Sequence, residues 1–183
     1  RIGDGDCYAI PSLSQRQNPV GAHQLLVDRV GGELVRVELR EIEKRVKAYA
    51  PNARLQGFLI QKMERGLVEV ILGFRRDPLV GPTITVGLGG VLAEIYKDAS
   101  TRLAPVDEAE AMEMIAEVKG LATVRGYRNM PKGDVAALAK TITAFSNLAH
   151  RQFADVAEAE INPLLVKRDG EGVVAVDGLV MLA

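Results

Sequence analysis

The segment from residue 160 to residue 177 constrains the fold most, because its sequence predicts two short strands joined by a tight turn. Two apolar runs, residues 164–166 and 173–176, flank the dipeptide Asp169-Gly170. An Asp-Gly pair between β-branched runs is a strong local signal for a β-hairpin. We therefore expect an antiparallel hairpin that fixes the positions of the polar side chains at its open end.

The register of this hairpin decides which polar side chains face one another. With a two-residue turn, Asn162 lies directly opposite Asp177. With a four-residue loop over 169–172, the pair becomes diagonal but stays on one face, because side chains alternate with a period of two. Glu160 shares the face of Asn162. In either register, one face of the hairpin carries two carboxylates and an amide carbonyl.

Two interpretations of this polar face are open. Carboxylates among apolar neighbours cost free energy unless they are paired or bound to a metal. A site with one or two hard oxygen ligands from the protein suits Mg²⁺, which keeps some bound water and completes its coordination shell with substrate phosphates. Alternatively, the hairpin is exposed and these side chains form its solvated face.

Composition bounds the class of protein. The chain has 183 residues and is 48% hydrophobic, which predicts one domain with a sizeable core, or one domain plus an appendage. Its net charge of −1 and its lack of a basic block give no indication of nucleic-acid binding. The single cysteine, Cys7, excludes an internal disulfide and fits a reducing, cytoplasmic setting. No apolar run approaches the roughly 20 residues that span a bilayer, so no membrane partner is expected.

Hydrophobic periodicity predicts an α+β fold in the order β-α-ββββ-αα-ββ, with a mainly antiparallel sheet covered by helices. Asp107 and Asp134 are expected to cap the two later helices. Residues 1–22 lack clear periodicity and are expected to form an arm or a remnant of something larger. The predicted strands cover residues 34–38, 55–63, 67–73, 83–86 and 91–96 and both sides of the hairpin, and the predicted helices cover residues 40–50, 108–119 and 134–153.

Other polar or glycine-rich positions each have a functional and a structural interpretation. The segment 87–90, Gly-Leu-Gly-Gly, either lets the backbone approach a ligand closely or forms a tight turn. Glu69 and Glu94 interrupt apolar strands, where a carboxylate either belongs to a site or marks the solvated face. Residues 75–77, Arg-Arg-Asp in a predicted loop, either hold an anionic group or are solvated.

A series of motifs follows in a fixed order along most of the chain. They are Gly-Phe-Leu-Ile-Gln-Lys-Met at 57–63, Arg-Asp-Pro-Leu-Val-Gly-Pro at 76–82, Val-Gly-Leu-Gly-Gly-Val-Leu-Ala-Glu-Ile-Tyr-Lys-Asp at 86–98, Arg-Leu-Ala-Pro at 102–105, Arg-Gly-Tyr-Arg at 125–128, Asp-Val-Ala-Ala-Leu at 134–138, Glu-Ile-Asn-Pro-Leu at 160–164 and Val-Asp-Gly at 176–178. In this order they resemble the C-terminal lobe of the ATP-grasp domain of NDP-forming acyl-CoA synthetases. That family includes the ADP-forming acetyl-CoA synthetases and is related to the succinyl-CoA synthetase β subunit.

The resemblance implies ATP or ADP and Mg²⁺ as cofactors. Asn162 and Asp177 match the motif residues that bind Mg²⁺ in the succinyl-CoA synthetase relatives. The strand end at 61–63 would meet the adenine mainly through backbone groups, Glu69 would hold the ribose hydroxyls, and the glycines with Glu94 would line the cleft. The implied nucleotide-binding residues are Gln61, Lys62, Met63, Glu69, Gly89, Gly90 and Glu94.

The chain also departs from the family pattern. Leu26, Val27 and Asp28 stand where family members carry a histidine-containing triplet. The first lobe of the grasp is mostly missing, and so are the CoA-binding and ligase domains. We therefore expect residues 23–183 to be an incomplete ATP-grasp domain, inactive alone, whose partner domains lie on another chain or an upstream segment of an oligomeric enzyme.

The function that the resemblance implies is a part of a ligase. Such an enzyme couples an acyl-CoA thioester, ADP and phosphate to ATP through Mg²⁺-dependent phosphoryl transfer. No residue of this chain is assigned a catalytic role. Two alternatives stay open: a non-catalytic remnant or interaction module of the same fold, and another ATP-grasp ligase acting on a carboxylate.

Overall fold

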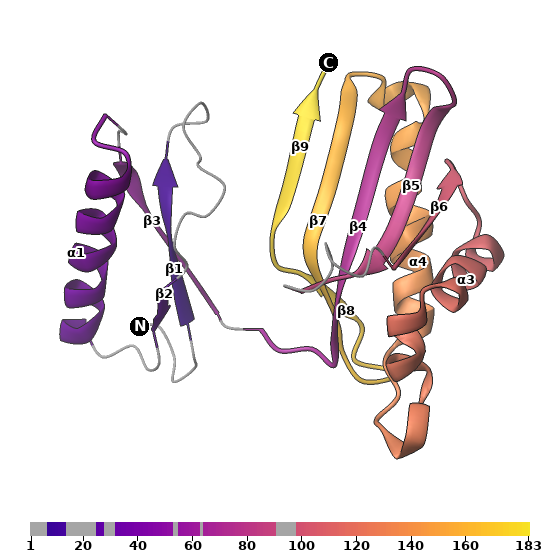
Figure 1. The fold of residues 1–183 in the computed structure, drawn as a ribbon, viewed down its shortest axis with the longest axis horizontal. Helices are drawn as coiled ribbons and strands as arrows, with labels where there is room; N and C mark the ends of the chain where they lie inside the picture. Colours follow the sequence, from indigo (N-terminus) through magenta and orange to yellow (C-terminus); the bar gives the residue numbers. More distant parts are fainter. Residues whose placement is uncertain (1–6, 14–24, 28–31, 53–54, 63, 91–97) are drawn as a thin grey trace. The chain divides into compact units, whose positions relative to one another are not determined.

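The computed structural model describes residues 7–13, 25–27, 32–52, 55–62, 64–90 and 98–183 (Figure 1). The chain divides into two compact units, residues 1–63 and 64–183. Among the described residues, none of the helices combines the length and the apolar character needed to cross a bilayer.

The first unit is a small antiparallel sheet with one helix. The strands are β1 (Cys7–Leu13), β2 (Leu25–Val27) and β3 (Leu55–Lys62), in the order β2-β1-β3. The predicted strand over 55–63 is thus confirmed as β3. Strand β1 lies within the segment expected to be an arm, so part of that segment is built into a sheet.

Helix α1 (Gly32–Tyr49) includes the segment 34–38, for which the sequence predicted a strand, and that prediction was wrong. The alternation of apolar and polar residues there is short, and it lies among strong helix formers. Ion pairs one turn apart, Arg45 with Glu41 and Lys47 with Glu43, follow on the exposed side of the same helix.

The second unit is built on a six-stranded sheet in which every pairing is antiparallel. The strand order is β6-β5-β4-β7-β8, and β9 also pairs with β7. The predicted α+β class is confirmed. The strands are β4 (Val68–Asp77), β5 (Gly81–Leu88), β6 (Ala99–Leu103), β7 (Val156–Val166), β8 (Val173–Ala175) and β9 (Gly178–Leu182).

Strands β4 and β5 form one long hairpin, whereas the sequence predicted a loop over residues 74–82. The carboxylate of Asp77 closes the turn by accepting the N–H groups of Leu79 (2.8 Å) and Val80 (3.1 Å). Gly81 follows with φ of +92°, a conformation that favours glycine. Strand β6 was not predicted, and the strand predicted over 91–96 lies outside the described residues.

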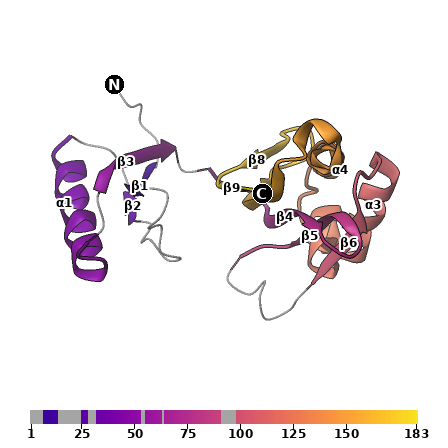
Figure 2. The ribbon, with the colours of Figure 1, turned by 90° about the horizontal axis from the view of Figure 1, so that it is seen from above.

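The helices α3 (Glu108–Glu117) and α4 (Val135–Ser146) pack on the same face of the sheet (Figures 1 and 2). Both predicted caps are confirmed: Asp107 accepts the N–H of Glu110 and Asp134 accepts that of Ala137, each at 2.9 Å. The core lies between the helices and the inner face of the sheet, where the alternating β4 side chains Val70, Leu72 and Phe74 are buried.

Short 3-10 helices replace the regular structure or loops predicted elsewhere. Helix α4 ends at Ser146, not near residue 153, and the chain continues in 3-10 turns. The buried Ser146 hydroxyl donates to the carbonyl of Thr143 (2.7 Å) and accepts the N–H of Val106 (3.0 Å). The 3-10 helices are η1 (Lys119–Arg125), η2 (Tyr127–Asn129), η3 (Asn147–Ala149) and η4 (Arg151–Phe153).

Candidate functional site

The register of the terminal hairpin agrees with the two-residue turn expected from the sequence. Leu164 pairs with Ala175, and Ile161 pairs with the first residue of β9. These pairs bracket Asn162 and Asp177 as facing residues, and the backbone N–H of Asn162 donates to the carbonyl oxygen of Asp177 over 3.1 Å. The predicted facing of the two residues is therefore present in the backbone register, and their sharing of a cation stays a prediction.

The turn itself is made by Asp169 and Gly170. The N–H of Glu171 donates to the carbonyl of Arg168 over 2.8 Å, which closes a four-residue turn. Gly170 has φ of +81°, so its lack of a Cβ is what allows this turn. The diagonal register of a four-residue loop, the other sequence-based alternative, is not adopted.

The donor atoms of the facing pair fit a hard divalent cation. The Nδ2 of Asn162 donates to Glu160 Oε1 over 3.0 Å, so the carbonyl oxygen of the same amide is left to act as a ligand. Asp177 is exposed and accepts the N–H of Gly178 at Oδ1 (2.8 Å). In the described ranges no group of three or more His, Cys, Asp or Glu could hold a metal alone. One oxygen from Asn162 and one from Asp177 would thus suit Mg²⁺, whose remaining ligands would be water and phosphate oxygens.

Glu69 and the Gly89-Gly90 pair lie next to each other, as a common site requires. The N–H of Gly89 donates to the Glu69 carbonyl over 2.7 Å. A Cβ on Gly89 would lie 2.8 Å from the Glu69 carbonyl carbon, and one on Gly90 would lie 3.4 Å from Glu69 Oε2. The lack of a Cβ at both glycines therefore allows their backbone to lie close to Glu69. The Gly89 N–H already donates to a protein acceptor, the Glu69 carbonyl.

The other nucleotide-binding positions implied by the resemblance remain predictions. Gln61 and Lys62 lie in β3 of the first unit, where they pair with Tyr8 and Cys7. Met63 and Glu94 lie outside the described residues. Their contacts with a nucleotide are expectations from the family pattern.

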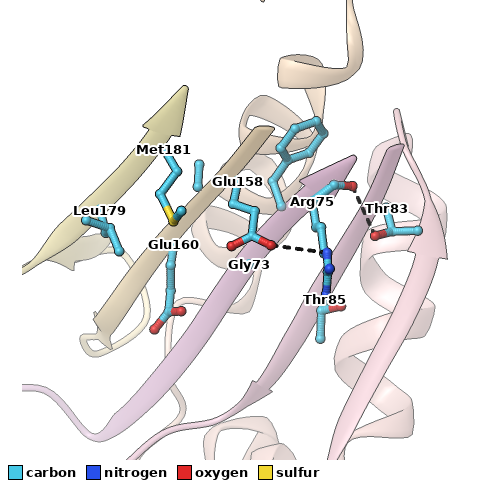
Figure 3. Close-up of a pocket in the computed structure, with 10 residues that line it drawn as sticks. Gly73, Arg75, Thr83, Thr85, Glu158, Glu160, Leu179 and Met181 are labelled. Carbon is cyan, nitrogen blue, oxygen red and sulfur yellow. Dashed lines mark hydrogen bonds and ion pairs between the residues drawn. The ribbon is translucent and has the colours of Figure 1, made fainter. Parts of the chain in front are cut away.

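A pocket lies on the face of the sheet opposite the helices (Figure 3). Figure 3 shows side chains from β4, β5, β7 and β9 directed into it, among them Arg75, Thr85, Glu158 and Glu160. Arg75 Nε and Glu158 Oε1 are 3.1 Å apart. Glu160 both lines the pocket and accepts the Asn162 Nδ2, so one hydrogen bond links the pocket lining to Asn162.

The neighbouring residues Arg75 and Arg76, which the sequence analysis left as one ambiguous group with Asp77, have different roles. Arg75 faces the pocket, whereas Arg76 donates to the carbonyls of Leu148 (2.8 Å), Phe153 (3.1 Å) and Val156 (3.0 Å). Arg76 therefore ties β4 to the segment that leads into β7. Extending the period of two through residues 73 and 75 of β4 would have assigned Arg75 to the open face.

Comparisons with known proteins identify the fold family. A family model described as an ATP-grasp domain matches residues 20–182. An ADP-forming acetate–CoA ligase I of Archaeoglobus fulgidus is 39% identical over 152 residues, which are 79% of this chain and 22% of the relative. The β subunit of ADP-forming acetate–CoA ligase II of Pyrococcus furiosus is 35% identical over 150 residues, which are 82% and 64% of the two chains. The chain thus spans less than two thirds of either relative.

Solved structures have a similar fold. The crystal structure of PH1788 from Pyrococcus horikoshii Ot3 aligns with a TM-score of 0.86 and 30% identity, covering 97% of this chain and 74% of that one. A dinucleotide-forming acetyl-coenzyme A synthetase 1 of Candidatus Korarchaeum cryptofilum, in complex with coenzyme A, Ca-AMPCP and HgCl⁺, aligns with a TM-score of 0.84 and 32% identity, covering 97% and 76%. The resemblance of the motifs is confirmed, and this chain belongs to the ATP-grasp domain family.

Proposed function

We propose that this chain is the nucleotide-binding part of an NDP-forming acyl-CoA synthetase of the acetate–CoA ligase type. The observation that carries the proposal is the facing of Asn162 and Asp177 on a hairpin whose register is fixed by hydrogen bonds. Membership of the ATP-grasp family and relatives that are ADP-forming acetate–CoA ligases support it. The acyl-CoA thioester, ADP and phosphate would be the substrates of the complete enzyme.

Asn162 and Asp177 would hold Mg²⁺ through one oxygen each. Glu160 contributes by accepting the Asn162 Nδ2, which orients the amide so that its oxygen faces away from Glu160. When bound, the cation supplies charge neutralisation on the nucleotide phosphates during phosphoryl transfer. Two protein ligands leave most of the coordination shell to phosphate and water, as is usual for Mg²⁺.

Glu69 is proposed to accept the ribose hydroxyls of the nucleotide. Its exposed carboxylate stands beside Gly90, where the lack of a Cβ leaves room for a ligand. Because the Gly89 N–H is bound to the Glu69 carbonyl, phosphate binding would fall to other groups, and the glycines would act by fixing the Glu69 backbone. Glu69 would thus recognise the sugar. Asn162 and Asp177 would bind the cation that is held by the phosphates.

The remaining chemistry of the complete enzyme is assigned to partner domains. Relatives include β subunits of ADP-forming acetate–CoA ligases, and a solved synthetase of Candidatus Korarchaeum cryptofilum is described with a phosphohistidine segment pointing towards its nucleotide-binding site. We accordingly propose that CoA-binding and ligase domains join this chain in a cytoplasmic oligomer.

Isothermal titration of the chain with ADP, with and without Mg²⁺, tests the proposal. The wild type is expected to bind ADP more tightly with Mg²⁺ than without it, and Asp177→Asn is expected to lose that difference. Asp155→Asn is the matched control, because it removes an exposed carboxylate of the same unit that lies outside the hairpin. Equal Mg²⁺ dependence in wild type and Asp177→Asn would contradict the proposed role of the pair.

A further inference from the structure

A single carboxylate, that of Asp134, joins the start of α4 to the turn of the β7–β8 hairpin. Its Oδ1 accepts the N–H of Ala137 over 2.9 Å, which is the helix cap. Its Oδ2 accepts the N–H of Gly170 over 3.1 Å and that of Gly172 over 2.9 Å. The residue is buried, with 8% of its surface exposed. The second oxygen is therefore devoted to a turn more than thirty residues away in the sequence.

Backbone hydrogen bonds reinforce this contact. The N–H of Asp134 donates to the carbonyl of Lys167, and the N–H of Asp169 donates to that of Lys132, both over 3.0 Å. Gly133 forms an antiparallel bridge with Arg168 between them. The segment before α4 thus pairs with the hairpin as a short strand would. The Asp134 side chain binds Gly170 and Gly172, which follow the paired residue Arg168 in the sequence.

The geometry of the two glycines explains how one oxygen can accept both N–H groups. Gly170 and Gly172 have φ of +81° and +80°, a region that only glycine occupies without strain. A Cβ at either position would meet nothing within 4 Å, so the requirement for glycine is set by the backbone alone. Asp134 therefore binds one particular conformation of the turn.

The conformation of the turn sets the register of the strands that follow it. In an antiparallel hairpin, a slip of one residue moves every side chain to the other face. In the observed register Asn162 faces Asp177. A slip would separate the two oxygens that are proposed to share one cation.

We propose that Asp134 is a positioning residue for the Asn162–Asp177 metal pair, because its second carboxylate oxygen holds the turn in the register that places these two residues directly opposite each other. The inference rests on the proposed function of the pair. Residues that orient metal ligands from behind typically contribute about 10- to 100-fold to metal affinity.

The variant Asp134→Ser separates the two roles of the carboxylate. Serine is a good N-cap, but its single oxygen cannot serve both the helix and the two glycines. We expect this variant to keep α4 and to bind MgADP about 10-fold more weakly than the wild type, with unchanged affinity for ADP in EDTA. The matched control is Asp107→Ser, because Asp107 caps α3 in the same way and its carboxylate accepts from Glu110 of that helix.

Amide exchange measured by NMR gives a readout that does not depend on nucleotide. In the wild type the Gly170 and Gly172 amides are expected to exchange slowly, and in Asp134→Ser both should exchange rapidly while the Ala137 amide stays protected. A general loss of stability would instead raise exchange at all three and weaken ADP binding equally with and without Mg²⁺, which would overturn the inference.

The outcomes separate this inference from the proposed function. If the wild type binds MgADP and Asp134→Ser binds it equally well, Asp134 has no positioning role and the proposed function stands. If the wild type shows no Mg²⁺-dependent binding, the proposed function fails and the positioning role fails with it. Should Asp134→Ser not fold, Asp134→Asn replaces it, since its Nδ2 is a donor and cannot accept from the glycines. Wild-type affinity for MgADP in that variant would likewise overturn the inference.

Discussion

The backbone N–H of Asn162 donates to the carbonyl oxygen of Asp177, 3.1 Å away across the terminal hairpin. This hydrogen bond fixes the two residues as neighbours on adjacent chain segments, although fourteen residues separate them in the sequence. Asn162 also donates its side-chain amide to Glu160. The register thus places Asn162 opposite Asp177, and the Glu160 carboxylate is bonded to the Asn162 amide.

The first prediction concerns the charge of the proposed cation site. Asn162→Asp replaces a neutral oxygen ligand by a charged one and removes the Nδ2 donor to Glu160. We expect binding of metal–ADP to persist, with a shift in preference among Mg²⁺, Mn²⁺ and Ca²⁺, because carboxylate number and site rigidity tune the choice of cation. Titrations of ADP with each metal measure this. An unchanged order of preference would argue against coordination by residue 162.

The second prediction concerns the contact between Gly89 and Glu69. Gly89→Ala would place a Cβ 2.8 Å from the Glu69 carbonyl carbon, so the backbone must move. We expect a loss of about 1–3 kcal/mol in the free energy of unfolding, as for overpacked sites, and weaker ADP binding. Urea unfolding and titration measure the two effects.

The matched control for this substitution is Gly73→Ala in strand β4. A Cβ there would meet nothing within 4 Å, and alanine is expected to be neutral or to stabilise by about 0.5–1 kcal/mol. Equal stability of Gly89→Ala and Gly73→Ala would show that the close approach to Glu69 does not constrain the fold.

The hairpin was predictable because its information is local. Asp169-Gly170 sits between β-branched runs, and counting outward from it gave the facing of Asn162 and Asp177. The helix caps at Asp107 and Asp134 were predictable for the same reason, since capping needs only residues within one turn.

Other features depended on distant partners and could not be predicted. The sequence predicts a loop over residues 74–82 between the two strands, because prolines at 78 and 82 and a glycine at 81 mark a turn and the polar residues before it carry no apolar alternation; in the structure both strands extend into this segment. The contact of Asp134 with Gly170 and Gly172 joins elements that periodicity cannot relate. The short alternation at 34–38 suggested a strand, but the surrounding helix formers decided the conformation.

The third prediction separates two adjacent arginines by their roles. Arg76 donates to three backbone carbonyls, and Arg76→Ala would leave these acceptors without their donor, at a cost of about 1–3 kcal/mol. Arg75 forms an exposed ion pair with Glu158, so Arg75→Ala should cost less than about 1 kcal/mol. Urea unfolding of both variants measures the difference. Equal losses would contradict the distinction.

The fourth prediction concerns acid sensitivity. The N–H groups of Ala137 and Gly172 hold the pKa of Asp134 below its ordinary value of 3.8. A carboxylate whose pKa is lowered by folding stabilises the protein fully when the pH is above its ordinary pKa. This stabilisation is lost as the pH falls through the pKa of the folded state. The stability difference between wild type and Asp134→Asn should therefore be constant from neutral pH down to about 5 and shrink in the region below about 4.

Urea unfolding at a series of pH values measures this difference. The pKa values of Asp77 and Glu117 are also lowered, through the N–H groups of Leu79 and Val80 and through Arg102, so the variant itself will keep some acid sensitivity. If the difference in unfolding free energy between wild type and Asp134→Asn stays constant down to the lowest pH measured, the Asp134 carboxylate gains no stability from its N–H donors.

The most direct test of the central claim is paramagnetic broadening of backbone amide signals by Mn²⁺ bound with ADP. If Asn162 and Asp177 hold the cation, their amides and that of Gly178 should broaden first, and Mg²⁺ in excess should reverse the effect. The same titration of Asp177→Asn should leave these signals sharp. Broadening centred on another part of the chain, or equal broadening in wild type and Asp177→Asn, would contradict the account.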